Sequence, residues 1–230
     1  MQEQTITLSA ALMAHPDRRE QVQEILARLD RPVEVTWDRI HDLWDTGRRA
    51  MLAYDPAADY HVVIQDDVLV PRDLLAGLEK ALTHVPAGHP VCGYIGRLRP
   101  WPERMSQLTA KAARQNASWV VMPEPIWGPL ICVPTACIKE MVQLCDGLDM
   151  RNYDLRVSRY FKEKGVDVWF PWPSIVDHAD GPSLIIGRSA TDRRTGRNRI
   201  AYRFCGEETS LLDVDFSGPV VRQTLGSLLH

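Results

Sequence analysis

Apolar residues in the first 95 positions recur in two rhythms, continuous runs typical of strands and one-sided patterns typical of helices. The runs predict strands over residues 5–13, 32–37, 60–64 and 91–95. The one-sided patterns predict helices from Pro16 to Leu29, over residues 42–54, and from Pro71 through Leu82. Because strands and helices alternate, we expect a parallel α/β sheet with helices on both faces.

The pattern becomes less regular after residue 95. Residues 96–105 are rich in proline and arginine, which predicts a surface loop. Further on, the pattern predicts two short strands within 119–134, helices over 135–145 and 150–165, and a strand over 166–170. The chain then has an arginine-dense segment, a mostly polar stretch and a short apolar end. Since no internal repeat or low-complexity linker interrupts it, we expect one domain over residues 1–230.

Composition narrows the class of protein. The chain is 45% hydrophobic and 25% charged with a net charge of −3, which is ordinary for a globular protein and gives no global sign of nucleic-acid binding. Five cysteines without C-x-x-C spacing indicate free thiols in a reducing compartment. The sequence shows neither a signal-peptide pattern nor an apolar run near the ~20 residues of a membrane span. We therefore expect a cytoplasmic protein with no membrane partner.

Two adjacent carboxylates follow the third predicted strand, in Gln65-Asp66-Asp67. An aspartate at this position commonly caps the next helix, here the one expected to open at Pro71. However, parallel α/β sheets bind ligands beyond the carboxyl ends of their strands, and carboxylates are the ligands that Mg²⁺ and Mn²⁺ prefer. Both interpretations remain open at this point.

Two later segments also contain residues suited to chemistry. Asp177, His178 and Asp180 follow another predicted strand, where the histidine is either structural or a metal ligand. Asn152 can cap a helix whose first turn holds Asp154. That carboxylate either stabilises the positive end of the helix dipole or accepts a proton from a substrate hydroxyl.

The order of these motifs resembles that of nucleotide-sugar glycosyltransferases of the GT-A fold. The likeness rests on His15-Pro16 and Arg18-Arg19 after the opening strand, then QDDV, WGPL, NYDLRVSRYFKEKG and DHADGPSLIIGR. It spans roughly residues 5–190 and is strongest toward small phage and bacterial enzymes, family-2-like in type. The resemblance implies a three-layer α/β/α sandwich with a mostly parallel central sheet. A phage-encoded enzyme would act in the host cytoplasm.

The resemblance also implies an activity and a division of the chain. A nucleotide-binding half (1–95) would precede an acceptor half (96–190) and a C-terminal tail (191–230). The enzyme would move a sugar from a nucleoside-diphosphate sugar, UDP-linked in first place, to an acceptor hydroxyl with inversion, using Mn²⁺ or Mg²⁺. Asp67 and His178 would bind the metal, and Asp154 would be the base. Residues that would contact the donor are His15, Arg18, Asp38, Gln65, Asp66 and Arg188. Trp127 and Gly128 would form the floor of the acceptor or sugar pocket. The family usually has an acid in place of Gln65, so a weaker metal site is expected.

Other features leave alternatives open. Segment 188–203 carries Arg188, Arg193, Arg194, Arg197, Arg199 and Arg203. It fits a solvated face, a loop that closes over the diphosphate, or a patch for a phosphate-rich acceptor such as DNA. Protein side chains, glycans and modified DNA bases are all open as acceptors, and oligomeric state is not indicated. A nucleotidyltransferase is the alternative enzyme, although AALMAHPDRRE lacks the glycine-rich phosphate loop expected of one. A noncatalytic nucleotide- or glycan-binding module is the alternative class.

Overall fold

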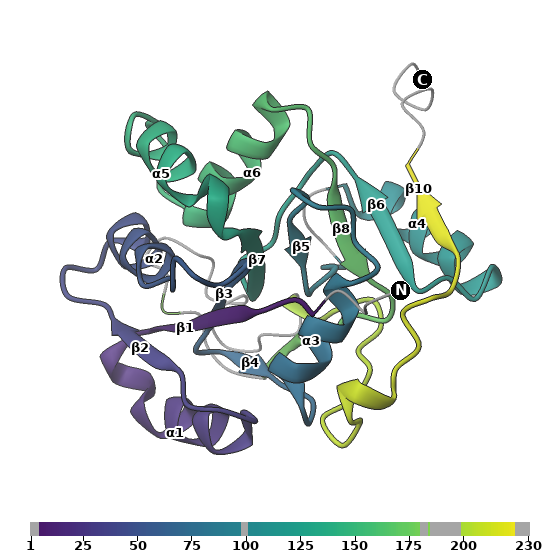
Figure 1. Cartoon of the computed structure of the whole chain (residues 1–230), viewed down its shortest axis with the longest axis horizontal. Helices are drawn as coiled ribbons and strands as arrows, with labels where there is room; N and C mark the ends of the chain where they lie inside the picture. The colour runs from purple at the N-terminus through teal and green to yellow at the C-terminus, as the bar shows by residue number, and fades with distance from the viewer. Residues whose placement is uncertain (1–4, 98–100, 180–183, 185–198, 224–230) are drawn as a thin grey trace.

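An eight-stranded sheet forms the centre of the molecule, with strand order β10-β6-β8-β5-β7-β3-β1-β2 (Figure 1). The computed structural model describes residues 5–97, 101–179, 184 and 199–223. The strands of this sheet are β1 (Leu8–Ala14), β2 (Glu34–Trp37), β3 (Tyr60–Gln65), β5 (Val91–Cys92), β6 (Trp119–Met122), β7 (Leu130–Pro134), β8 (Val168–Pro171) and β10 (Val220–Arg222). A separate two-stranded sheet pairs β4 (Val68–Leu69) with β9 (Asp177–His178).

The direction of the strands follows the expected pattern in the first half of the chain. Strand β1 pairs in parallel with both β2 and β3, and parallel ladders also join β5 to β8 and β6 to β10. Strand β7 runs antiparallel between β3 and β5, and β6 is antiparallel to β8. Residues 60–64 are buried throughout, as an apolar run in a sheet covered on both faces requires. The predicted α/β class with a mostly parallel sheet is confirmed.

Helices cover the sheet on two sides. They are α1 (Arg19–Arg28), α2 (Leu43–Leu52), α3 (Leu74–Leu82), α4 (Pro102–Arg114), α5 (Ile138–Asp146) and α6 (Tyr153–Glu163), with 3₁₀ turns η1 (Pro16–Arg18), η2 (Thr135–Cys137) and η4 (Leu211–Asp213). Helices α2, α5 and α6 pack together on one side, and α1 and α3 lie on the other (Figure 1). None of the described helices is long and apolar enough to cross a membrane.

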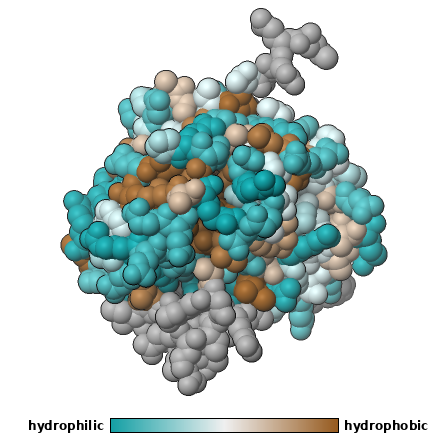
Figure 2. Space-filling view, turned by 90° about the horizontal axis from the view of Figure 1, so that it is seen from below, coloured by the Kyte–Doolittle hydropathy of each residue, from teal (hydrophilic) through white to brown (hydrophobic). Residues whose placement is uncertain are grey.

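The face of the molecule shown in Figure 2 is mostly polar, as expected when the apolar sides of the helices pack on the sheet. Figure 2 shows the molecule from below the view of Figure 1, with hydrophilic residues over most of the face and hydrophobic residues in smaller patches between them. The large apolar side chains of the core lie instead between the sheet and its helices, where Leu12, Ile64 and Leu78 are fully buried. Removal of these side chains from water is the main stabilising term of such a fold.

Helix α6 illustrates how well a strong pattern predicts an element. Tyr153, Val157, Tyr160 and Phe161 share one face by spacing, and all four are buried. Gly165 follows the helix with φ +64, a left-handed conformation that glycine adopts without steric cost. The predicted helix and its end are confirmed.

The start of α3 differs from the sequence prediction. Pro71 does not open the helix, because Arg72 pairs with the C-terminal part of the chain and its N–H donates to the Thr209 carbonyl over 3.0 Å. The helix begins only after Asp73, which has a left-handed φ of 55. Distant Asp30 caps it by accepting from the N–H groups of Leu75 and Ala76, each over 2.9 Å. The helix-cap interpretation of Asp66 and Asp67 is therefore wrong.

The expectation of a surface loop over residues 96–105 is wrong for its last part, where α4 begins. Pro102 takes a first-turn position, in which a missing N–H costs nothing. Met105, Leu108 and Ala112 then recur at helical spacing and are buried. A proline that starts a helix was interpreted as a loop signal.

Strand β10 was not predicted. Only Val221 of its three residues is buried, so the stretch has no apolar run to mark it. The strand exists because its backbone pairs in parallel with β6, about one hundred positions earlier in the chain. Long-range pairing of this kind leaves little trace in local sequence.

His61 gives the first testable prediction. It is fully buried in β3, with Nε2 2.9 Å from the Ala50 carbonyl oxygen and Nδ1 2.9 Å from Ser9 Oγ. Burial lowers the pKa of His61. The unfolded chain therefore binds this proton more readily, and stability is lost as the pH falls below the unfolded pKa of about 6.5. We expect His61 to contribute a loss of up to about 1.4 kcal/mol per pH unit in the free energy of unfolding.

Urea unfolding between about pH 7.5 and 5.5 measures this contribution. A His61→Gln variant is expected to lose stability less steeply than the wild type over this range, whereas the exposed His84→Gln variant should keep the wild-type slope. Equal slopes in the wild type and His61→Gln would contradict the prediction.

Candidate functional site

Strand register brings the candidate residues together. Strands β1, β2 and β3 are parallel neighbours, so their carboxyl ends meet at one edge of the sheet. His15, Asp38 and Asp66 are the residues that follow these three strands. The His15 N–H donates to Asp66 Oδ2 over 2.6 Å, and the Asp38 N–H donates to the Ala14 carbonyl over 2.7 Å. These side chains therefore lie together at the carboxyl ends of the strands, as the sequence predicts.

Arg18 holds the two adjacent carboxylates. Its Nη1 lies 2.6 Å from Asp66 Oδ1 and 3.1 Å from Asp67 Oδ2. Arg199, from the C-terminal part of the chain, donates from Nη1 to the same Asp67 Oδ2 over 2.8 Å. Both aspartates are buried, so water does not stabilise their negative charges. The positive charges of the arginines stabilise them instead.

The two carboxyl groups differ in their tendency to ionise. Burial raises the pKa of Asp66, and the Arg18 charge offsets only part of that effect. Burial also disfavours the charged form of Asp67. However, the neighbouring side chains of His178, Arg18 and Arg199 hold the pKa of Asp67 well below its usual range. Asp67 is therefore the firmly ionised member of the pair.

Strand β9 carries His178 to Asp67. The β4–β9 pairing places His178 opposite Val68, and its Nδ1 lies 3.4 Å from Asp67 Oδ1. Apart from this contact with each other, neither of these two buried atoms has a hydrogen-bond partner within the described part of the chain. Two ligands of one octahedral ion at about 2.1 Å stand about 3 Å apart. A divalent ion between Oδ1 and Nδ1 would thus need only a small adjustment and would satisfy both atoms.

A pocket of about 220 Å³ lies beside this pair. It is lined by Asp17, Arg18, Gln21, Asp67, Ala179, Leu184 and Arg199. Its volume is below the ~300 Å³ at which sites for drug-sized ligands begin, so it fits a part of a larger ligand. The two guanidinium groups in its wall suit an anionic group of phosphate size.

A second set of contacts links β3 to the start of α6. Gly128 packs so tightly on Gln65 that an added Cβ would lie 2.7 Å from Gln65 Nε2. The Tyr153 hydroxyl donates to the Gly128 carbonyl. Asp154 follows in the first turn of α6, half-buried, and its Oδ1 accepts from the Leu155 N–H over 2.9 Å. Gly128 thus fixes Asp154 relative to the end of β3.

The remaining sequence-predicted residues are accounted for as follows. Trp127 is 9% exposed, and its ring packs edge-on against Tyr94 and Phe170. Arg188 lies outside the described residues, as do Arg193, Arg194 and Arg197 of the same segment. Arg203 is exposed.

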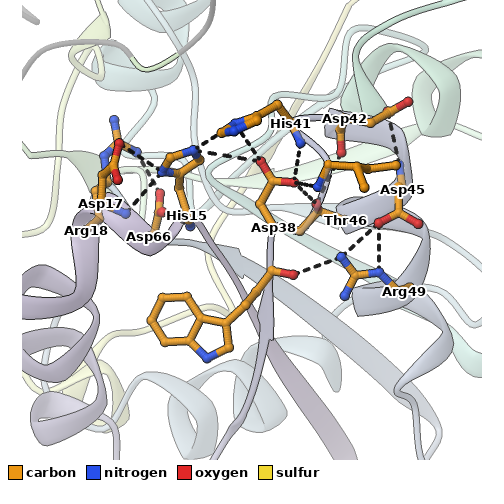
Figure 3. Close-up of polar contacts among 12 residues, drawn as sticks. His15, Asp17, Arg18, Asp38, His41, Asp42, Asp45, Thr46, Arg49 and Asp66 are labelled. Carbon is orange, nitrogen blue, oxygen red and sulfur yellow. Dashed lines mark hydrogen bonds and ion pairs between the residues drawn. The ribbon is translucent and has the colours of Figure 1, made fainter.

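Three residues near the site were missed at the sequence level. His41 contacts both His15 and Asp38 (Figure 3). The Tyr94 ring packs against His178 at a centroid distance of 5.3 Å, and its hydroxyl donates to the Arg199 carbonyl. Tyr153 binds Gly128 as described above. His41 comes shortly after a strand, which is the positional signal that singled out Asp66 and Asp67. Tyr94 follows β5 in the structure but lies inside the strand predicted over 91–95, so the same signal does not mark it.

No protein-family model and no curated protein matches this sequence. Among solved structures, the catalytic domain of Drosophila β1,4-galactosyltransferase 7 with xylobiose matches at 13% identity and a TM-score of 0.42, over 91% of this chain and 85% of that chain. A mutant of the Drosophila enzyme in complex with manganese, UDP-Gal and xylobiose matches at 14% identity and a TM-score of 0.40, over 90% and 84%. Neither structure is of a phage or bacterial protein, so the likeness to phage and bacterial enzymes gains no support from them.

The shared guanidinium of Arg18 gives a testable prediction about the site. Arg18→Met leaves two adjacent buried carboxylates without their common partner, and breaking a buried ion pair costs about 3–5 kcal/mol. We expect a loss of that order in the free energy of unfolding at pH 7, measured with urea. Arg19→Met is the matched control, because Arg19 is exposed and stacks on Trp37 at 4.8 Å, a contact of about 1 kcal/mol or less. Equal losses in the two variants would contradict the role given to Arg18.

Proposed function

We propose that this chain is a glycosyltransferase of the GT-A type. It moves a sugar from a nucleoside-diphosphate sugar, UDP-linked in first place, to an acceptor hydroxyl with the help of Mn²⁺ or Mg²⁺. One observation supports the proposal: the Asp67–His178 pair, whose facing atoms have no other hydrogen-bond partner among the described residues, lies beside a pocket lined by Arg18 and Arg199, at the carboxyl edge of parallel strands. Side chains suited to a metal and cations suited to phosphate are thus adjacent.

Asp67 Oδ1 and His178 Nδ1 are the atoms that would hold the metal. An imidazole nitrogen with a single carboxylate suits Mn²⁺ better than Mg²⁺, which prefers oxygen ligands. The bound ion would supply charge neutralisation to the diphosphate leaving group. Affinity should be modest, because Gln65 is neutral and Asp67 Oδ2 already accepts from two guanidinium groups.

The other residues divide into those that bind the donor and those that orient it. Arg18 and Arg199 would contact the diphosphate in the 220 Å³ pocket. His15 and Asp38 would border the nucleotide at the ends of β1 and β2. Gln65 and Asp66 would contact the ribose or the sugar, with Trp127 and Gly128 beneath.

Asp154 would be the general base. It would take the proton of the acceptor hydroxyl as that oxygen attacks the anomeric carbon, opposite the departing diphosphate, so the configuration inverts. The Tyr153–Gly128 contact would position the carboxylate for this role, since it joins the start of α6 to the floor of the site.

Donor hydrolysis tests the class of enzyme before the acceptor is known. The chain is incubated with a panel of nucleotide sugars in Mn²⁺ or EDTA, and released nucleoside diphosphate is assayed. UDP-Gal with Mn²⁺ is the first combination, because the matched mutant structure holds both. We expect slow release from one donor that stops in EDTA. Binding without release would indicate a noncatalytic module, and neither binding nor release from any donor would contradict the proposal.

Variants separate the role of the general base from that of the metal ligand. Asp154→Asn should lower turnover about 100-fold or more, the usual contribution of a general base, while the donor Kd stays nearly unchanged. Asp67→Asn should instead abolish the Mn²⁺-dependent part of donor binding. Asp213→Asn, at an exposed aspartate in η4, is the matched control. Wild-type turnover in Asp154→Asn would remove the assignment of the base.

A further inference from the structure

Three potential ligand atoms converge where β1 and β2 end (Figure 3). His15 Nε2 lies 3.3 Å from His41 Nδ1 and 3.9 Å from Asp38 Oδ2, and His41 Nδ1 lies 3.8 Å from the same oxygen. A point equidistant from three atoms with these separations is about 2.1 Å from each, which is the length of Zn–N and Zn–O bonds. One ion can therefore contact all three atoms with little movement.

The carboxylate of Asp38 is already oriented for this role. Its Oδ1 accepts from the Ile40 N–H over 3.2 Å, the His41 N–H over 3.0 Å and the Thr46 hydroxyl over 3.2 Å. These three bonds fix the side chain and leave Oδ2 directed at the two imidazole rings (Figure 3). A ligand oriented by surrounding hydrogen bonds is the usual arrangement in metal sites.

His41 is held close to His15 by its backbone. It has a φ of 55, a left-handed conformation that is uncommon for a side chain with a Cβ. The turn made by Asp38 Oδ1 stabilises this conformation, and the two rings lie 5.3 Å apart between centroids. His41 is 73% exposed, so its ring reaches the site from the surface.

Contacts on the other ring nitrogen orient His15. Its Nδ1 accepts from the Asp17 N–H over 3.1 Å, and the Asp17 carboxylate lies 3.6 Å from the same atom. These contacts leave Nε2 facing His41. A carboxylate near the second nitrogen of a metal-binding histidine is a common arrangement in metal sites.

We propose that His15, Asp38 and His41 form a second cation site, separate from the Asp67–His178 pair, for a transition-metal ion such as Zn²⁺ or Co²⁺. Two imidazole nitrogens and one carboxylate favour these ions over Mg²⁺ and Ca²⁺, which prefer oxygen ligands. Three protein ligands leave a fourth position open to water or to a bound molecule. The site shares no ligand with the Asp67–His178 pair and does not rest on the proposed function.

Titration of the full chain with Co²⁺ tests the proposal, because four- or five-coordinate Co²⁺ absorbs visible light much more strongly than hydrated Co²⁺. We expect one equivalent to give this absorption and Zn²⁺ to displace it. His41→Ala should weaken Zn²⁺ binding, measured by calorimetry, at least about tenfold, and Asp17→Asn should weaken it about tenfold through its contact with His15. His84→Ala removes an exposed histidine elsewhere and should leave binding unchanged.

Further variants assign the binding to one site. His178→Ala and Asp67→Asn should keep the Co²⁺ absorption, because neither side chain is a ligand of the His15–Asp38–His41 site. The proposal is overturned if the wild type binds Zn²⁺ no more tightly than His41→Ala, or if His178→Ala abolishes the absorption. Neither result depends on a donor assay, so failure here and failure of the glycosyltransferase proposal are distinguishable.

Discussion

The candidate site depends on the burial of two adjacent carboxylates against one guanidinium. Asp66 and Asp67 would repel each other at the end of a buried strand if Arg18 did not lie between them. Arg199 adds a second cation on Asp67 from the far end of the chain. Because this arrangement uses Asp67 Oδ2, the other oxygen faces His178. The same charge pairing that makes the strand end stable therefore leaves one carboxylate oxygen available for a metal.

The sheet brings further residues to the buried aspartate pair. Parallel register places His15, Asp38 and Asp66 side by side, although they are separated by about 50 residues of chain. Strand β7 enters the same edge in the opposite direction, so Gly128 meets Gln65 there. Helix α6 is tied to that edge through the contact of Tyr153 with the Gly128 carbonyl. Carboxylates, arginines and imidazoles from separate parts of the chain therefore meet near the ends of these strands.

Much of this arrangement was predictable, for reasons that particular residues make clear. The strands of the first half and α6 have strong periodic patterns, and the aspartate pair was conspicuous because it ends an apolar run. Strand β10 and the start of α3 depend on distant backbone pairing, which local sequence does not record. Proline can begin a helix, as Pro102 does in α4, but it ends helices elsewhere, so its presence alone does not decide between the two. His41 was missed because its role depends on a left-handed turn and on a neighbour 26 positions away.

The central claim is that Asp67 and His178 together hold a divalent ion that engages a nucleoside diphosphate. Pulsed electron paramagnetic resonance of Mn²⁺ with the protein and UDP tests it directly, because a coordinated imidazole produces a nitrogen coupling. We expect a nitrogen coupling that disappears in His178→Ala and persists in His41→Ala. Absence of the coupling in the wild type, or its persistence in His178→Ala, would show that His178 does not bind the ion.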